Sequence, residues 1–243
     1  MRAQTQYLRD SSALGCFEVN VDNSLVMPSW LNSWKQQLTS EKFEISSSHN
    51  EALARLMPFL LCGEQSAIQV FGTEISRLQG SSWSKSIRLL KSIESDEYAH
   101  EEALQTLSSL LMQPTDLNDI KRRARHFYIR LGNTKGMTEH FARVAQLDAC
   151  VCIIMNAISK SDLGKNSLAT QLVDKIKKDE ARHVGVSKKH FHYLGGDEAT
   201  LKRNKRDVSK KLVALLQTEA DSFESLGVDS DILFRKLTNA RQR

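Results

Sequence analysis

The feature that most restricts the fold of this chain is an internal duplication of spaced acidic and histidine residues. In the first half, Glu64 is followed after 31 residues by the segment DEYAH at residues 96–100. In the second half, Asp148 is followed after 30 residues by DEARH at residues 179–183. A helix, a turn and most of a second helix fill such an interval. The repeat therefore predicts two antiparallel helix pairs, each with its acid and its DExxH segment at the same height.

The composition favours long helices over a fold rich in turns. The chain has 11 Gly and 3 Pro among 243 residues, about half of the share found in average proteins. From about residue 50 onward, the apolar residues recur at helical spacing. Signals for helix starts and ends predict helices over residues 46–78, 82–112, 116–131, 137–160, 165–194 and 197–226, followed by a short tail helix.

We therefore predict an all-α protein with a single domain. Residues 50–243 would form this helical domain, and residues 1–49 an irregular N-terminal arm packed on it. Within the arm, residues 15–22 alternate between apolar and polar side chains, which predicts a short strand or an extended segment. Trp30 and Trp34 are four residues apart and predict a short helix packed on the body.

The duplicated segments carry residue types that bind metal ions. Residues i and i+3 share a face of an α-helix, so the Glu and the His of each DExxH segment can bind one ion. Glu64 and Asp148 lie among apolar residues, where an unpaired carboxylate would be costly. Four carboxylates and two imidazoles form a donor set that suits iron or manganese. The predicted metal ligands are Glu64, Glu97, His100, Asp148, Glu180 and His183.

This pattern resembles the ferritin-like di-iron carboxylate superfamily over about residues 50–195. The DEARH segment is most similar to bacterial di-iron oxygenases of the p-aminobenzoate N-oxygenase type. The resemblance implies a ferritin-like four-helix bundle with additional helices that binds two iron ions, with manganese as the alternative metal. It also implies that Asp96 and Asp179 each accept a hydrogen bond from the metal-bound histidine of the opposite half.

The activity that the resemblance implies is that of a non-haem di-iron oxygenase. Such an enzyme uses O2 and electrons from an external donor to hydroxylate or N-oxygenate a small organic substrate. Phe71, Leu104 and Val151 lie next to the ligands and are expected to line a dry substrate cavity, although each also fits an ordinary core position. Ile176 stands where related N-oxygenases carry a seventh ligand, and Asp148 replaces the usual Glu. N-oxygenation therefore does not follow from the resemblance alone.

Two other functions remain open at this stage. A tRNA-modifying di-iron hydroxylase would use the basic runs at residues 121–126 and 202–211 to contact phosphates. Charge runs on long helices usually form solvated faces, so nucleic acid is not the expected partner. A non-catalytic ferritin-like protein would bind iron or scavenge oxidants and would yield no organic product. A homodimer is compatible with the sequence.

The sequence also predicts the cellular compartment. No apolar run approaches the roughly 20 residues of a membrane helix, and residues 1–12 lack the apolar segment of a secretory signal. We therefore expect a cytoplasmic protein with no membrane partner. No CxxC pair occurs, and the cysteines are expected to be reduced core residues. They are Cys16, Cys62, Cys150 and Cys152.

Four further positions carry local predictions. Pro58 is expected either to kink the first long helix or to mark its start. Gly63 lies inside that helix next to Glu64 and predicts a local bulge or a close approach to the metal site. His190 and His192 are expected to be cations that the dipole favours at the C-terminal end of a helix.

Overall fold

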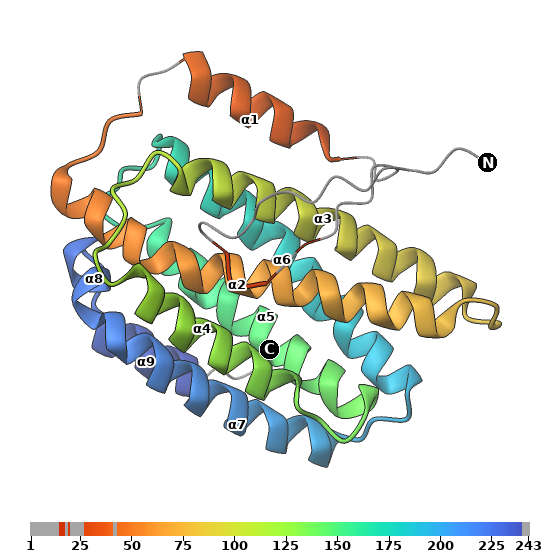
Figure 1. Cartoon of the computed structure of the whole chain (residues 1–243). Helices are drawn as coiled ribbons and strands as arrows, with labels where there is room; N and C mark the ends of the chain where they lie inside the picture. Colours follow the sequence, from red (N-terminus) through yellow and green to blue (C-terminus); the bar gives the residue numbers. More distant parts are fainter. Residues whose placement is uncertain (1–14, 18, 20–26, 41–42, 240–243) are drawn as a thin grey trace.

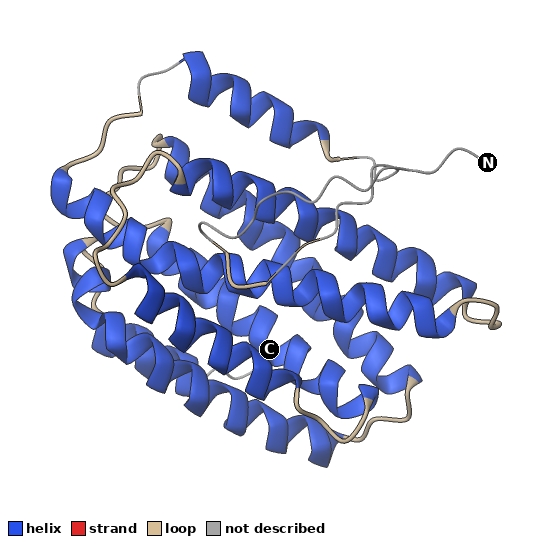
Figure 2. Ribbon diagram, viewed as in Figure 1, coloured by secondary structure: helices blue, strands red, loops and turns tan. Residues whose placement is uncertain are grey.

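Figure 1 shows the computed structural model of the chain, which describes residues 15–17, 19, 27–40 and 43–239. Helices dominate these residues and no strand occurs among them (Figure 2), so the all-α prediction is confirmed. The α-helices are α1 (Ser29–Ser40), α2 (Ser47–Leu78), α3 (Ser84–Ser108), α4 (Leu117–Gly132), α5 (Met137–Ile158), α6 (Leu168–Tyr193), α7 (Glu198–Leu216), α8 (Ala220–Ser225) and α9 (Ser230–Thr238).

The four longest core helices form two hairpins. α2 packs most extensively against α3, and α5 packs most extensively against α6. Contacts between α3 and α6 join the two hairpins, while α4 covers α2 and α7 covers α5. Figure 1 shows α2 and α3 side by side, with α4 running between the end of α3 and the start of α5. The duplicated segments therefore lie on helices that face one another.

The first core helix is continuous. Ser46 caps α2, because its side chain accepts a hydrogen bond from the backbone N–H of His49 at 3.2 Å. The helix then runs through Pro58 to Leu78, and Gly80 follows with a φ of 78°. The alternative in which Pro58 starts the helix is therefore wrong.

Two apolar clusters fill the interior. The larger one lies between α2, α3, α5, α6 and α7 and includes Leu53, Leu61 and Ile176, none of which is exposed. The smaller one surrounds Phe71 and Phe141, also fully buried. Complete burial of such side chains stabilises the fold by roughly 1.5–3 kcal/mol each. This packing holds the four core helices in fixed register around the charged residues between them.

The predicted short helix with Trp30 and Trp34 is α1, which lies across α3 and α6 (Figure 1). The indole N–H of Trp34 donates a 3.0 Å hydrogen bond to the carbonyl of Leu168 at the start of α6. The predicted strand or extended segment at residues 15–22 falls partly outside the described residues. Its described residues, 15–17 and 19, are not in a strand.

The cysteine prediction is wrong for one pair. Cys16 and Cys62 form a disulfide, with Cα atoms 5.1 Å apart, whereas Cys150 and Cys152 are free. Gln65 holds the arm in place, because its Oε1 accepts hydrogen bonds from the backbone N–H of Cys16 at 2.8 Å and from that of residue 17 at 2.9 Å. This contact lays Cys16 against the turn of α2 that carries Cys62.

The single helix predicted over residues 197–226 is wrong in its second half. α7 ends at Leu216, and a 3-10 turn, Gln217–Glu219, leads into α8. The turn directs the buried carboxylate of Glu219 inward, where it pairs with Arg55 at 2.7 Å and Arg123 at 2.6 Å. Because two cations fix that carboxylate, the chain changes direction at this point. The short tail helix is present as α9.

One helix within the described ranges, α5, is long and apolar enough to cross a membrane by length and composition. Its most apolar window is 56% buried inside the protein, and α5 packs against α6 and α7. A core helix of a soluble bundle meets the same criteria.

Candidate metal centre

The two halves of the duplicated pattern meet in the interior. Glu64 comes from α2, Asp148 from α5, and the two Glu-His pairs come from α3 and α6. The apolar faces of these helices point inward, and the charged residues share those faces. None of the six is more than 8% exposed. They are Glu64, Glu97, His100, Asp148, Glu180 and His183.

Four of these residues form a compact cluster. Glu64, Glu97, His100 and Glu180 each offer one ligand atom, and these atoms all lie within 4.8 Å of one another. Nδ1 of His100 is 3.3 Å from Glu64, 3.8 Å from Glu97 and 3.7 Å from Glu180. This buried group could hold a metal ion.

His183 extends the cluster toward a second position. Its Nδ1 lies 3.1 Å from Glu97 and 3.4 Å from Glu180. Among the described residues this buried nitrogen has no hydrogen-bond partner. A buried imidazole nitrogen that faces two carboxylates without a hydrogen bond suits a metal ligand, because a cation would satisfy all three groups. Glu97 and Glu180 therefore each face both imidazoles.

The outer nitrogens of the two histidines make crossed contacts. Nε2 of His100 lies 3.3 Å from Asp179, and Nε2 of His183 lies 3.3 Å from Asp96. Each histidine thus contacts the aspartate of the opposite half, which is the pairing that the resemblance implies. A proton on Nε2 that is donated to the aspartate leaves the Nδ1 lone pair directed into the cluster. Both rings are therefore oriented for binding a cation.

Basic side chains hold the two aspartates in turn. Asp179 pairs with Lys175 at 3.2 Å, and Asp96 pairs with Arg182. These charge-assisted contacts hold the two aspartate carboxylates in place, and the carboxylates in turn orient the imidazole rings. A second layer of fixed groups around the ligands is typical of metal sites in proteins.

Asp148 lies at the edge of the group, outside the four-residue cluster. Ser187 Oγ donates a 3.5 Å hydrogen bond to its Oδ2. Burial raises the pKa of Asp148 well above its usual value, and the nearby Glu180 carboxylate raises that pKa further. Asp148 is thus close enough to interact with the ligand residues. Its role as a ligand stays a prediction.

The electrostatics of the cluster favour a bound cation. Burial raises the pKa of Glu64 well above its usual value, and the Glu97 carboxylate adds to this effect. Burial lowers the pKa of His100, but Glu64 and Asp179 outweigh it and the net pKa is well above the usual value. These shifts mean that protons on Glu64 and His100 offset the negative charge of the cluster. Metal ions would displace those protons and take over that role.

Gly63 lies close to the hydroxyl of Tyr128, whereas the sequence predicts a close approach to the metal site. α2 is regular at this position, so no bulge forms. A Cβ at position 63 would lie 2.8 Å from the hydroxyl of Tyr128 on α4. That hydroxyl donates a 3.1 Å hydrogen bond to the carbonyl of Phe59. Sequence reasoning missed Tyr128, and the only signal for it was a glycine inside a core helix.

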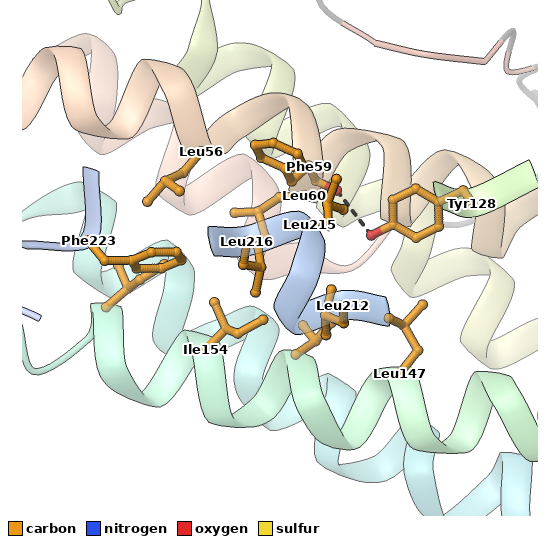
Figure 3. A pocket seen from close by; sticks show the side chains of 12 residues that line it. Leu56, Phe59, Leu60, Tyr128, Leu147, Ile154, Leu212, Leu215, Leu216 and Phe223 are labelled. Carbon is orange, nitrogen blue, oxygen red and sulfur yellow. Dashed lines mark hydrogen bonds between the residues drawn. The ribbon is translucent and has the colours of Figure 1, made fainter. Parts of the chain in front are cut away.

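An apolar cavity lies beside this tyrosine (Figure 3). It has a volume of about 20 Å³. Val151, which the sequence places in a substrate cavity, lines it, whereas Phe71 and Leu104 are fully buried elsewhere and do not. The lining residues come from α2, α4, α5, α7 and α8 and are Leu56, Phe59, Leu60, Tyr128, Leu147, Val151, Ile154, Ile158, Leu212, Leu215, Leu216 and Phe223.

A much larger groove of about 850 Å³ lies where α5 and α6 meet the segment that leads into α9. Its walls mix apolar side chains with polar ones, among them Lys160, Lys177 and Lys236. Cys152 lies in the wall, one turn after Asp148. Burial raises the pKa of the Cys152 thiol to about 12, with further contributions from Glu180 and Asp148. The groove therefore approaches the carboxylates from the side of α5.

A second buried charge pair was not predicted. Glu74 and His190 are both buried, with 2.5 Å between Glu74 Oε1 and His190 Nε2, and Arg77 binds the same carboxylate at 2.6 and 2.7 Å. Both histidines lie in the last turn of α6, as predicted. His190 is nevertheless buried, with its ring packed against Phe141, whereas His192 is exposed.

Some cations of the basic runs are paired with acids of the protein itself. In the first run, Arg123 pairs with the buried Glu219, and Lys121 is partly buried, which lowers its pKa. In the second run, Lys211 pairs with Asp207.

No family model, curated protein or solved structure matches the chain. The geometry and chemistry of the buried cluster are therefore what indicate a function.

Proposed function

We propose that the protein is a non-haem di-iron oxygenase with a ferritin-like four-helix core. It activates O2 with electrons from an external donor and hydroxylates or N-oxygenates a small organic substrate. One observation carries the proposal. Two inward-facing imidazole nitrogens share the carboxylates of Glu97 and Glu180, and each outer nitrogen contacts an aspartate of the opposite half.

The donor set fits two ions of a hard or borderline metal. His100 and Glu64 would hold one ion, and His183 with Asp148 would hold the other. Glu97 and Glu180 face both imidazoles and would help to hold the ions. Carboxylate oxygens with imidazole nitrogens suit iron, with manganese as the alternative. When bound, two such ions would relay electrons from the external donor to O2 and would supply Lewis acidity.

The surrounding residues prepare the site for that chemistry. Asp96 and Asp179 hold the imidazoles in one tautomer, and their contacts with Arg182 and Lys175 keep them in place. The apolar clusters on both sides keep bulk water from the ligands. Exclusion of water protects a reactive oxidant from side reactions. An iron-storage site has no such requirement, so the dry setting favours an oxygenase.

The groove beside α9 is the candidate position for the organic substrate. Its volume of about 850 Å³ lies in the range of sites for small organic ligands, roughly 300–1,000 Å³. Its wall reaches Cys152, close to Asp148 and Glu180. Replacing Ala181, which also lines the groove, by Trp should inhibit product formation while iron binding stays unchanged.

Metal analysis tests the proposal. Protein purified after growth with added iron should contain about two metal ions per chain. The double substitution His100→Ala and His183→Ala should reduce this content to less than one, while His192→Ala, which removes an exposed imidazole, should leave it unchanged. A wild-type content below one iron or manganese per chain that the double substitution does not alter would refute the metal centre.

Turnover then separates the candidate functions. Iron-loaded, chemically reduced protein should consume O2 and convert an organic substrate to an oxygenated product that mass spectrometry detects, with 18O from 18O2 incorporated. O2 or peroxide consumption without any organic product would instead support an iron-binding or oxidant-scavenging protein. Salt-dependent RNA binding that is lost on neutralising Lys121, Arg122 and Arg123 would support the tRNA-modifying alternative.

A further inference from the structure

The small apolar cavity of Figure 3 borders the residues that carry the ligands. On α2, Leu60 precedes Glu64 by one turn. On α5, Leu147 and Val151 flank Asp148 on either side. The cavity therefore contacts α2 and α5, the two helices that each contribute one acid to the candidate metal centre.

Tyr128 forms the boundary between the cavity and the centre. Its ring lines the cavity, and its hydroxyl rests against α2 at Gly63, the residue before Glu64. The lack of a side chain at position 63 is what lets the hydroxyl come so close. Figure 3 shows the dashed hydrogen bond from this hydroxyl to Phe59, which points it at the backbone of α2.

The lining gives water almost nothing to bind. Eleven of the twelve side chains are Leu, Ile, Val or Phe, and the hydroxyl of the twelfth, Tyr128, donates its hydrogen bond to the carbonyl of Phe59. A buried water molecule needs two to four polar partners, and apolar cavities without them stay dry and bind apolar atoms such as xenon. The occupant that this lining favours is therefore apolar.

The size limits the occupant further. A cavity of about 20 Å³ exceeds the roughly 10–15 Å³ that one water-sized molecule needs, but it is far below the several hundred Å³ of an organic ligand site. A small apolar molecule fits.

We propose that this cavity is a binding site for dioxygen, held beside the metal centre until it reacts. The assignment of dioxygen as the gas rests on the proposed oxygenase function, whereas the affinity for a small apolar molecule rests on the cavity alone. Tyr128 and Val151 are positioning residues: they shape the space that the gas occupies before it reaches the ligands.

Xenon is the probe for the cavity itself. Xenon-pressurised crystals of the full chain should show one anomalous peak between the side chains of Val151 and Leu212. Val151→Ile adds one methylene group and should remove that peak. Val213→Ile makes the same change at a half-buried position of the same core that does not line the cavity, so it should leave the peak unchanged. Leu212→Ala should increase xenon occupancy.

Three results would overturn the site: no xenon in the wild-type cavity, an ordered water molecule in its place, or equal xenon binding by Val151→Ile. Thermal unfolding followed by circular dichroism checks that each variant is folded before its xenon binding is measured.

Oxygen kinetics test the assignment of the gas. In the iron-loaded protein, Val151→Ile should raise the KM for O2 several-fold with little change in kcat, and Val213→Ile should change neither. An unchanged KM in a variant that has lost xenon binding would overturn the role in dioxygen delivery. If the wild-type protein consumes no O2 at all, the oxygenase function fails, while the xenon result still decides the cavity.

Discussion

Nδ1 of His183 lies 3.1 Å from Oε1 of Glu97, although the two residues belong to opposite halves of the duplicated pattern. The same nitrogen is 3.4 Å from Glu180 on its own helix. The imidazole of His183 thus faces one carboxylate from each half, and the ring of His100 lies 5.9 Å away. The buried cluster is therefore a product of both hairpins together.

The aspartates behind the histidines should control metal affinity. Asp96→Asn keeps the size of the side chain but removes the charge that orients His183, so affinity for the metal should fall by about 10- to 100-fold. Competition with a chromogenic chelator measures the change. Asp119→Asn, which alters an exposed acid paired with Arg122, is the matched control and should bind metal as the wild type does. Equal affinity in Asp96→Asn would contradict the role of this residue.

The contact between Gly63 and Tyr128 should make the core intolerant of one added methyl group. Gly63→Ala places a Cβ 2.8 Å from the tyrosine hydroxyl and should reduce the free energy of unfolding by about 1–3 kcal/mol. Tyr128→Phe removes the hydroxyl, so the double variant should recover part of that loss. Gly185→Ala on α6 meets nothing within 4 Å and should stabilise the protein by about 0.5–1 kcal/mol. Urea titrations measure all four proteins, and additive effects of the first two changes would show that the contact is absent.

The buried pair of Glu74 and His190 should carry a large share of stability. Glu74→Ala leaves His190 and Arg77 without their carboxylate and should cost about 3–5 kcal/mol of unfolding free energy. Glu51→Ala, which removes an exposed acid from the same helix, should have little effect. A loss below about 1 kcal/mol in Glu74→Ala would mean that the pair is solvated.

The same carboxylate predicts a pH dependence. Burial raises the pKa of Glu74, but Arg77 and His190 outweigh it, and the net pKa lies below the ordinary 4.5. Because the folded pKa is the lower one, this stabilisation is complete above pH 4.5 and is lost as the pH falls through the folded pKa. Glu74→Gln should therefore show a shallower fall in stability below pH 4.5 than the wild type, as measured by urea midpoints. His140 also faces Glu74, so His140→Gln is the control for its titration.

The disulfide between Cys16 and Cys62 determines how many thiols can react and contributes to the free energy of unfolding. Oxidised protein should react with two equivalents of a thiol reagent after unfolding, from Cys150 and Cys152. Cys16→Ser should lower the free energy of unfolding by about 2–4 kcal/mol under oxidising conditions and have a much smaller effect in the presence of reductant. Cys150→Ser, which alters a free thiol, should not show this dependence on reductant. Four reactive thiols in the oxidised protein would contradict the bond.

The sequence was sufficient to predict most of the helices and to predict that the two DExxH segments lie close together. Apolar spacing over 20 or more residues leaves little choice of secondary structure, and the i, i+3 relation then places Glu97 beside His100. The break at Gln217–Glu219 was not predictable in this way. It depends on Arg55 and Arg123, which are far from Glu219 in sequence and reach it only in the folded chain.

The contacts that the sequence did not predict share one physical cause: the two residues of each contact are far apart in the chain. Cys16 and Cys62 are separated by 46 residues with no motif that links them. His190 and Glu74 are 116 residues apart, and only the packing of α6 against the first hairpin joins them. Tyr128 likewise reaches α2 from a helix that carries none of the predicted ligands. Periodicity describes one helix at a time, so it does not report which side chains meet between helices.

The crossed contacts of His100 with Asp179 and of His183 with Asp96 also determine how this protein can be divided. A fragment that ends after α3 would keep His100 but lose the aspartate that orients it, and the complementary fragment would lose the partner of His183. Neither fragment is therefore a self-sufficient module. The crossed contacts thus make the orientation of each histidine depend on the folding of the other half of the chain.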